Sequence, residues 1–180
     1  SVSITLGTAA IGVAYGFAEK ASKVNTWLGS NGGSISGYNN IDAGAKSTGM
    51  VKTTAFALGG GISVGVQGVI TRAHDISTVN STVYGNIATG SGVMTVSAQS
   101  VPEIYSSAFG VTLSGSAAMG GSFAYATTDT IATAEVANGV VFSGDGKVVV
   151  RSETGKGSDD SYVSAHSKAF AASGGMMLGI

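Results

Sequence analysis

Three short sequence landmarks recur in the same order along the chain, at intervals of about 53 residues. The first landmark is Ala55–Ala57 (AFA), which returns as Ala108–Gly110 (AFG) and Ala169–Ala171 (AFA). A recurrence of this length is typical of solenoids, propellers and arrays, in which stacked neighbours bury a face that one unit cannot bury alone. The interval therefore constrains the fold more than any single segment does.

Two further landmarks keep this order. The second comprises Phe17–Ala21, matched with Val69–Ala73 and Phe123–Thr127, together with Lys23–Thr26, matched with Asp75–Thr78 and Thr130–Thr133; the third is Ile41–Ala45, matched with Met94–Ala98 and Val148–Ser152. We predict one domain over 1–180 with units 1–54, 55–107 and 108–168 and a partial unit 169–180. Gly155–Tyr162 is interpreted as an inserted surface loop, and the strand-like ends suggest a fragment of a longer chain.

The segment Ala55–Ile70 has no charge, and from Ile62 it alternates with a period of two. Ile62, Val64 and Val66 fall on one face, and Ser63, Gly65 and Gln67 on the other, as expected for a β-strand with unlike faces. We expect a long apolar strand over Ala55–Thr71. A more polar strand should follow, with Ile76, Val79, Val83 and Ile87 as apolar anchors. A short strand is expected at Val93–Ala98, a break at Pro102, and tight corners or hairpins at Asn31–Gly33 and Gly144–Gly146.

Composition favours an all-β fold. Val and Ile greatly outnumber Leu, and no segment has a sustained helical period. The uncharged run Ile104–Thr128 is too crowded with Ser, Thr and Gly to favour a membrane helix. We predict a parallel β-solenoid of about three imperfect repeats of ~53 residues. Its core should consist of Val, Ile, Ala and Phe with Ser/Thr ladders outside. A unit of this length fits either one broad coil or two narrow ones.

No residue pattern supports a catalytic, cofactor-binding or metal site. His74 and His166, the only histidines, occupy non-equivalent repeat positions and are interpreted as surface-strand residues. Asp159–Asp160 is better explained as a loop tip than as a carboxylate pair, and Gly144–Gly146 lacks the nine-residue recurrence of calcium repeats. The G-x-S-x-G text at Gly61–Gly65 lies within strand-like sequence rather than at a strand-to-helix turn. The sequence therefore predicts a protein that is not an enzyme.

Aromatic side chains and net charge leave the choice of partner open. Packing within strands is the expected role of the aromatic residues, although an exposed row of them would suit glycans. They are Trp27, Tyr15, Tyr38, Tyr84, Tyr105, Tyr125 and Tyr162. The Thr-rich run Thr127–Thr133 does not recur in the other units, so an ice-binding face is not expected. The formal net charge of −1 provides no footprint for nucleic acid, and the absence of Cys leaves the redox compartment undefined.

The pattern within each unit resembles the repeats of large secreted bacterial proteins, namely filamentous-haemagglutinin-like adhesins and fusobacterial leukotoxin-type exoproteins. The residues that carry the resemblance are Gly61–Ile70 (GISVGVQGVI) with Gly92–Ala98 (GVMTVSA), and Gly120–Ala126 (GGSFAYA) with Gly146–Ser152 (GKVVVRS). The resemblance implies a β-helical shaft, export across the outer membrane, and a role in adhesion, biofilm formation or toxin display. It transfers no catalytic residue.

We therefore expect the structural shaft of a fibre or adhesin that is extracellular and attached to the bacterial cell surface. Its partners would be copies of itself, by end-to-end or lateral strand stacking, and a host or neighbouring-cell surface. Two alternatives stay open at this point. A β-helical polysaccharide-degrading enzyme would need clustered acids, whereas the acids here are scattered. An outer-membrane β-barrel segment would suit the alternation and low charge, but the ~53-residue unit fits the spacing of barrel strands poorly.

Overall fold

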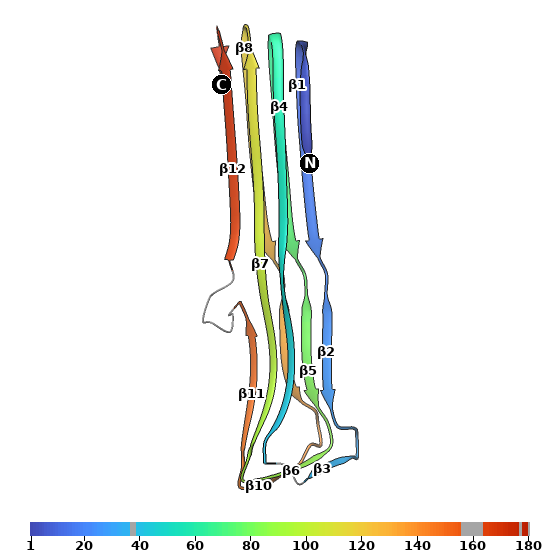
Figure 1. The fold of residues 1–180 in the computed structure, drawn as a ribbon. Helices are drawn as coiled ribbons and strands as arrows, with labels where there is room; N and C mark the ends of the chain where they lie inside the picture. The colour runs from blue at the N-terminus through green and yellow to red at the C-terminus, as the bar shows by residue number, and fades with distance from the viewer. Residues whose placement is uncertain (37–38, 156–163, 177, 180) are drawn as a thin grey trace.

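A computed structural model describes residues 1–36, 39–155, 164–176 and 178–179 of the chain. These residues form β-strands and connections and contain no helix. The molecule is elongated, with long strands running side by side along its length (Figure 1). The strands are β1 (Val2–Lys20), β2 (Lys23–Leu28), β3 (Ser34–Ser36), β4 (Ile41–Asp75), β5 (Thr78–Val83), β6 (Asn86–Gly90), β7 (Val93–Ser114), β8 (Ala117–Thr128), β9 (Ile131–Val136), β10 (Phe142–Gly144), β11 (Lys147–Thr154), β12 (Ser164–Gly175) and β13 (Leu178–Gly179).

Among the described residues, every strand pair is parallel and joins one segment to its counterpart in the next unit. The partners are β1 with β4, β4 with β7 and β8, β2 with β5, β5 with β9, β3 with β6, β6 with β10, β7 with β11 and β12, and β8 with β13. The prediction of an all-β fold with parallel strands is confirmed. Paired residues lie about one repeat of ~53 residues apart rather than half a repeat apart. The pairing therefore repeats once per unit, not twice.

The first and third sequence landmarks have the predicted register. Phe56 pairs with Phe109, and Phe109 pairs with Phe170. Likewise Ile41 pairs with Met94, which pairs with Val148. The recurring text therefore marks positions that lie side by side in the sheet.

The second landmark was matched in the wrong register. Phe17 pairs with Arg72, three residues beyond the predicted partner Val69. The β1/β4 register itself also shifts by one residue at the bend between Gly7 and Ala9. Phe123 pairs with Ile70, one residue from the predicted partner. A slip of one residue exchanges the two faces of a strand, so apolar text alone could not align this segment.

The central segment is not one straight strand. Before Gly61 the strand β4 pairs with β7, and from Val64 onward it pairs with β8, so the chain reverses direction between these residues. A Cβ on Gly61 would lie 2.0 Å from the carbonyl oxygen of Val64. Glycine is therefore needed for the tightness of this bend. Similar bends follow Gly7 in β1 and separate β7 from β8 (Figure 1).

The prediction that phenylalanine lies in the core and Ser/Thr ladders lie outside is wrong. Phe17, Phe123 and Phe170 are each more than half exposed. Thr71 and Thr112 are fully buried, and Ser81 is buried and donates to the carbonyl oxygen of Ala43 at 2.7 Å. Two closely packed sheets leave no interior volume for aromatic rings, but small hydroxyl side chains fit. Some of them find partners between the layers, as the 2.7 Å bond between the hydroxyls of Thr71 and Ser106 shows.

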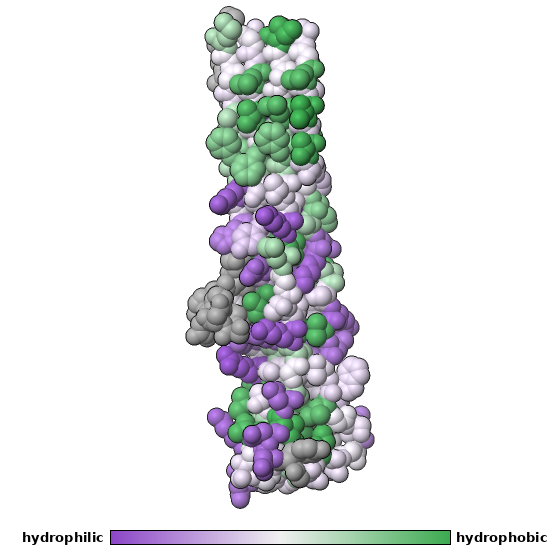
Figure 2. All heavy atoms as spheres, in the orientation of Figure 1, coloured by the Kyte–Doolittle hydropathy of each residue, from purple (hydrophilic) through white to green (hydrophobic). Residues whose placement is uncertain are grey.

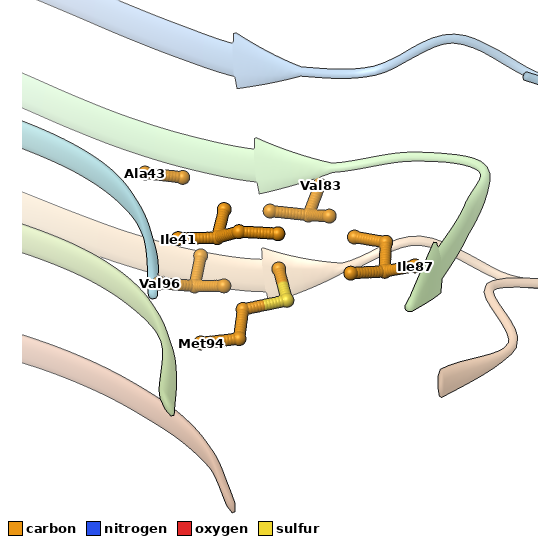
Figure 3. Close-up of a cluster of buried hydrophobic side chains, with 6 residues drawn as sticks. All are labelled: Ile41, Ala43, Val83, Ile87, Met94 and Val96. Atoms are coloured by element: carbon orange, nitrogen blue, oxygen red, sulfur yellow. The ribbon is translucent and has the colours of Figure 1, made fainter. Parts of the chain in front are cut away.

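The interior tapers along the molecule. At the end near β6 it holds larger apolar side chains, which pack together in Figure 3: Ile41, Ala43, Val83, Ile87, Met94 and Val96. Towards the bends the corresponding cluster is Ala14, Ala55, Ala57, Val69 and Ala108. The two layers approach more closely there, and a Cβ on Gly16 would lie 2.7 Å from the hydroxyl of Thr53. Alanine and glycine at these positions permit that approach.

The sequence suggested a break at Pro102, but this residue does not end a strand. It is fully buried within β7 and pairs with Gly49 of β4. Among the described residues, β11 ends opposite Ser100 and β12 begins opposite Glu103. Pro102 thus lies where no described strand pairs on the second side, so its missing N–H removes no ladder bond there.

An insertion interrupts the last unit where the sequence predicted it. The pairing interval with β7 is 54 residues for β11 and 61 residues for β12. The extra residues fall between Thr154 and Ser164, the interval that contains the whole of the predicted loop. Residues 156–163 themselves lie outside the described part of the chain.

Candidate functional site

Charged side chains from three units meet where β4 leads into β5. Lys20 of β1 pairs with Asp75 of β4, and Glu19 is the register partner of His74. The next unit contributes Asp129, directly after β8. We call Glu19, Lys20, His74, Asp75 and Asp129 the charged crossing.

Asp75 is the buried centre of this crossing. Its side chain is inaccessible to solvent, and Oδ2 lies 3.2 Å from Nζ of Lys20. Oδ1 accepts from the backbone N–H of Ser77 at 2.9 Å and from the Ser77 hydroxyl. These bonds satisfy a carboxylate that would otherwise be costly to bury. The arrangement holds two units in register.

His74 is buried rather than exposed, which corrects its sequence interpretation. Nε2 lies 2.8 Å from Oδ2 of Asp129, and Nδ1 lies 3.5 Å from Oε2 of Glu19. Both ring nitrogens are therefore engaged by carboxylates of neighbouring units. A catalytic histidine needs one nitrogen directed at a nucleophile or substrate. This geometry suits a bridge between units better than a general base.

The repeat alignment could have revealed the crossing. In the register of β1 with β4, Glu19 lies beside His74 and Lys20 lies beside Asp75. Ionisable side chains of opposite type are therefore neighbours. The incorrect register of the second landmark concealed this pairing. Charge complementarity between units is thus a signal that apolar matching misses.

The other sequence candidates are not brought together. His166 stacks on Tyr105 with ring centroids 5.1 Å apart, remote in register from His74. Gly61–Gly65 forms the bend of β4, and no helix follows it. Gly144 has a φ of 120° and lies at the corner between β10 and β11, which is a tight corner rather than an antiparallel hairpin. Asp159, Asp160, Tyr38 and Tyr162 lie outside the described residues.

The end of the molecule at the bends carries exposed apolar side chains on both outer faces. We call it the apolar end; Figure 2 shows these side chains gathered there on the visible face. The segments that build it, 1–18, 53–71, 104–128 and 169–176, contain no charged or histidine side chain. Its exposed members include Val2, Ile4, Leu6, Ile11, Val13, Tyr15, Phe17, Ile62, Ile70, Leu113, Met119, Phe123, Tyr125 and Phe170. A contiguous apolar surface of this kind marks an interaction site.

A groove lies on the outer face of the sheet formed by β2, β5 and β9. Its volume is about 520 Å³, and it is open to solvent. The lining residues are Asn25, Thr26, Trp27, Asn80, Thr82, Tyr84, Thr133 and Glu135. Its aromatic and polar side chains are those found in ligand-binding sites. The groove and the apolar end are therefore the two candidate recognition surfaces.

Comparisons with known proteins do not assign these surfaces. No protein-family model, curated protein or solved structure matches the chain. Within the described ranges, no helix is long and apolar enough to cross a membrane. The same residues hold no group of three or more His, Asp or Glu arranged as metal ligands.

Proposed function

We propose that the chain is a parallel β-solenoid segment that serves as the structural shaft of a secreted bacterial surface fibre or adhesin. Its work would be mechanical, and it would associate with further copies of itself by strand stacking. The sequence resemblance to large secreted repeat proteins supports the cell-surface location. No catalysis is proposed, because the one buried histidine has both ring nitrogens engaged by carboxylates.

The observation that carries this proposal is the in-register parallel pairing of successive units. Each strand pairs with the equivalent strand of the neighbouring unit. The outermost strands therefore present unpaired backbone groups to which a strand of another copy could bind in the same way. In the described part of the chain, β1 and β2 pair on one side only. The backbone groups on their other side would accept a matching strand.

The apolar end supports lateral association with a second copy. Its outer faces expose the larger apolar side chains, whereas its interior holds Ala and Gly. Water-exposed apolar area of this extent is unfavourable, at about 25 cal/mol per Å². Two such faces packed at the ~10 Å spacing of stacked sheets would remove much of it from water.

The backbone geometry of β1 provides a sharp test of edge stacking. The N–H of Ile76 donates to the carbonyl oxygen of Lys20 at 2.9 Å. Alternate residues of a parallel strand direct their backbone groups to opposite sides. The register is continuous from Ala9 to Lys20, so even-numbered residues here face β4 and Val13 faces the open edge. Val13 is also exposed, with 65% of its surface accessible.

The experiment compares Val13→Pro with Val13→Thr by electron microscopy and sedimentation. Proline removes the edge N–H without removing a bond to β4, whereas threonine keeps it. We expect filaments or long stacks from the wild-type chain and from Val13→Thr, and short particles from Val13→Pro with unchanged circular dichroism. Monodisperse compact particles from the wild-type chain at high concentration would refute self-association.

A further inference from the structure

The groove on the β2–β5–β9 sheet indicates ligand binding in addition to a mechanical role, because its side chains are those of a ligand site. Trp27 is 69% exposed, although tryptophan is among the side chains that proteins bury most on average. One exposed aromatic residue would need no explanation. Here Trp27 shares a groove with Tyr84, so two aromatic surfaces stand beside one set of polar groups.

The polar groups of the groove are held in place by the sheet. Asn25, Asn80 and Thr133 are register partners on adjacent strands, about 4.8 Å apart. Nδ2 of Asn80 donates to Oδ1 of Asn25 at 3.0 Å. That bond leaves the amide N–H groups of Asn25 and the carbonyl oxygen of Asn80 for a ligand.

The next register row combines stacking with acceptance of hydrogen bonds. Trp27, Thr82 and Glu135 are partners in this row. The indole presents a flat apolar face with an N–H at its rim, and the carboxylate of Glu135 accepts paired hydroxyl groups. The paired strands fix the backbone positions from which these side chains project.

These features define the chemistry of the ligand. A sugar ring has C–H faces that pack on aromatic planes and a rim of hydroxyls that both donate and accept. The lining contains no basic side chain and one carboxylate, which disfavours phosphate, sulfate and acidic sugars. We propose that this groove binds a neutral pyranose unit of an oligosaccharide or polysaccharide. The volume of about 520 Å³ lies within the range of small-ligand sites.

The chain contains a single tryptophan, so its intrinsic fluorescence reports on this groove directly. The probes are neutral hexasaccharides of glucose, galactose and mannose, with an oligogalacturonate as the acidic comparison. We expect a saturable shift or quenching of Trp27 emission with at least one neutral probe, at a Kd at or below about 1 mM. The acidic probe should bind more weakly.

Calorimetry on variants separates binding from a structural role of the same residues. Trp27→Ala and Asn80→Leu should each weaken binding about tenfold or more, because they remove the stacking face and the amide. Tyr125→Ala, an exposed aromatic residue of the apolar end, is the matched control and should bind as wild type. Circular dichroism should be unchanged for all three, since Trp27 and Tyr125 are exposed and Asn80 projects outward.

Three outcomes would overturn the assignment. They are the absence of a saturable fluorescence change with any neutral probe at about 10 mM, equal affinity of Trp27→Ala and wild type, and equal loss of affinity in Tyr125→Ala. A chain that forms no stacks yet binds a neutral probe would refute the proposed assembly and leave the groove assignment standing.

Discussion

At the residue scale, the protein depends on the sizes of small side chains between closely packed layers. Gln67 is the clearest case, because its register partners in the two adjacent units are Gly12 and Gly120. A Cβ on Gly110 of the facing layer would lie 1.5 Å from Nε2 of Gln67. One long side chain is thus accommodated by glycines around it.

The close fit of Gln67 against Gly110 predicts that substitutions at these two positions are energetically coupled. Gly110→Ala should lower the free energy of unfolding by about 1–3 kcal/mol, because Gln67 must leave its place. Combining it with Gln67→Ala should recover part of that loss, with a coupling of at least about 0.5 kcal/mol in a double-mutant cycle. Urea unfolding measures both.

Gly68→Ala is the matched control for this cycle. No atom lies within 4 Å of a Cβ at Gly68, so the change should stay within about 0.5 kcal/mol. Additive effects of Gly110→Ala and Gln67→Ala would show that the two residues do not share one space.

The charged crossing makes a second prediction at this scale. Asp75→Ala removes the buried carboxylate that pairs with Lys20 and accepts from the N–H of Ser77, in a place that water does not reach. We expect a loss of about 2–3 kcal/mol in unfolding free energy, less than for a fully buried pair because Lys20 is partly exposed. Asp42→Ala, at an exposed position of β4, should change stability by no more than about 0.5 kcal/mol. Equal effects of the two substitutions would contradict the assigned role.

At the scale of the element, the outer face of β4 changes from polar to apolar along the strand. Asp42 and Lys46 are exposed in its first part, whereas Val64 and Ile70 are exposed after the bend. The inward face holds both apolar and polar side chains in each part. The alternation was visible in the sequence. Its direction was not, because a period of two is the same for either face.

This difference between the faces predicts that threonine substitutions affect association at outward positions and stability at inward positions. Replacing Ile4, Ile11 and Phe123 with threonine at the apolar end should reduce association in sedimentation velocity. Unfolding free energy should fall little, since these side chains are exposed and threonine favours strands.

The inward pair Val79→Thr and Val83→Thr is the control for these outward changes. Both valines are fully buried, so each buried hydroxyl should cost about 1–3 kcal/mol. Unchanged association of the triple threonine variant would show that the apolar end does not contact another copy.

At the scale of the whole molecule, stability should be the sum of units and the contacts between them. Deleting Ala55–Ser107 removes one interval and joins Thr54 to Ala108, which is the register partner of Ala55 and so takes its place. We expect a folded β-rich protein with a lower melting temperature, measured by circular dichroism. A shorter deletion, Ala55–Thr95, joins strands out of register and should prevent folding. Similar behaviour of the two deletions would contradict independent, interchangeable units.

The sequence by itself determined the interval, the β class, the tight corner at Gly144–Gly146 and the place of the insertion. Each of these depends on local text: period-two alternation, turn residues, and landmarks such as the recurring Phe56, Phe109 and Phe170. Such signals persist because every unit must match its neighbour residue by residue to complete the backbone ladders.

Only the tertiary structure decided which face is inside, how far apart the layers lie, and which charges and aromatics meet. The burial of His74 and the convergence of Trp27 and Tyr84 on one groove depend on how neighbouring units pair in register. A small interior accepts Ser, Thr and Ala and excludes Phe, and that choice is made by the distance between two layers that are remote in sequence. No single stretch of the chain encodes that distance.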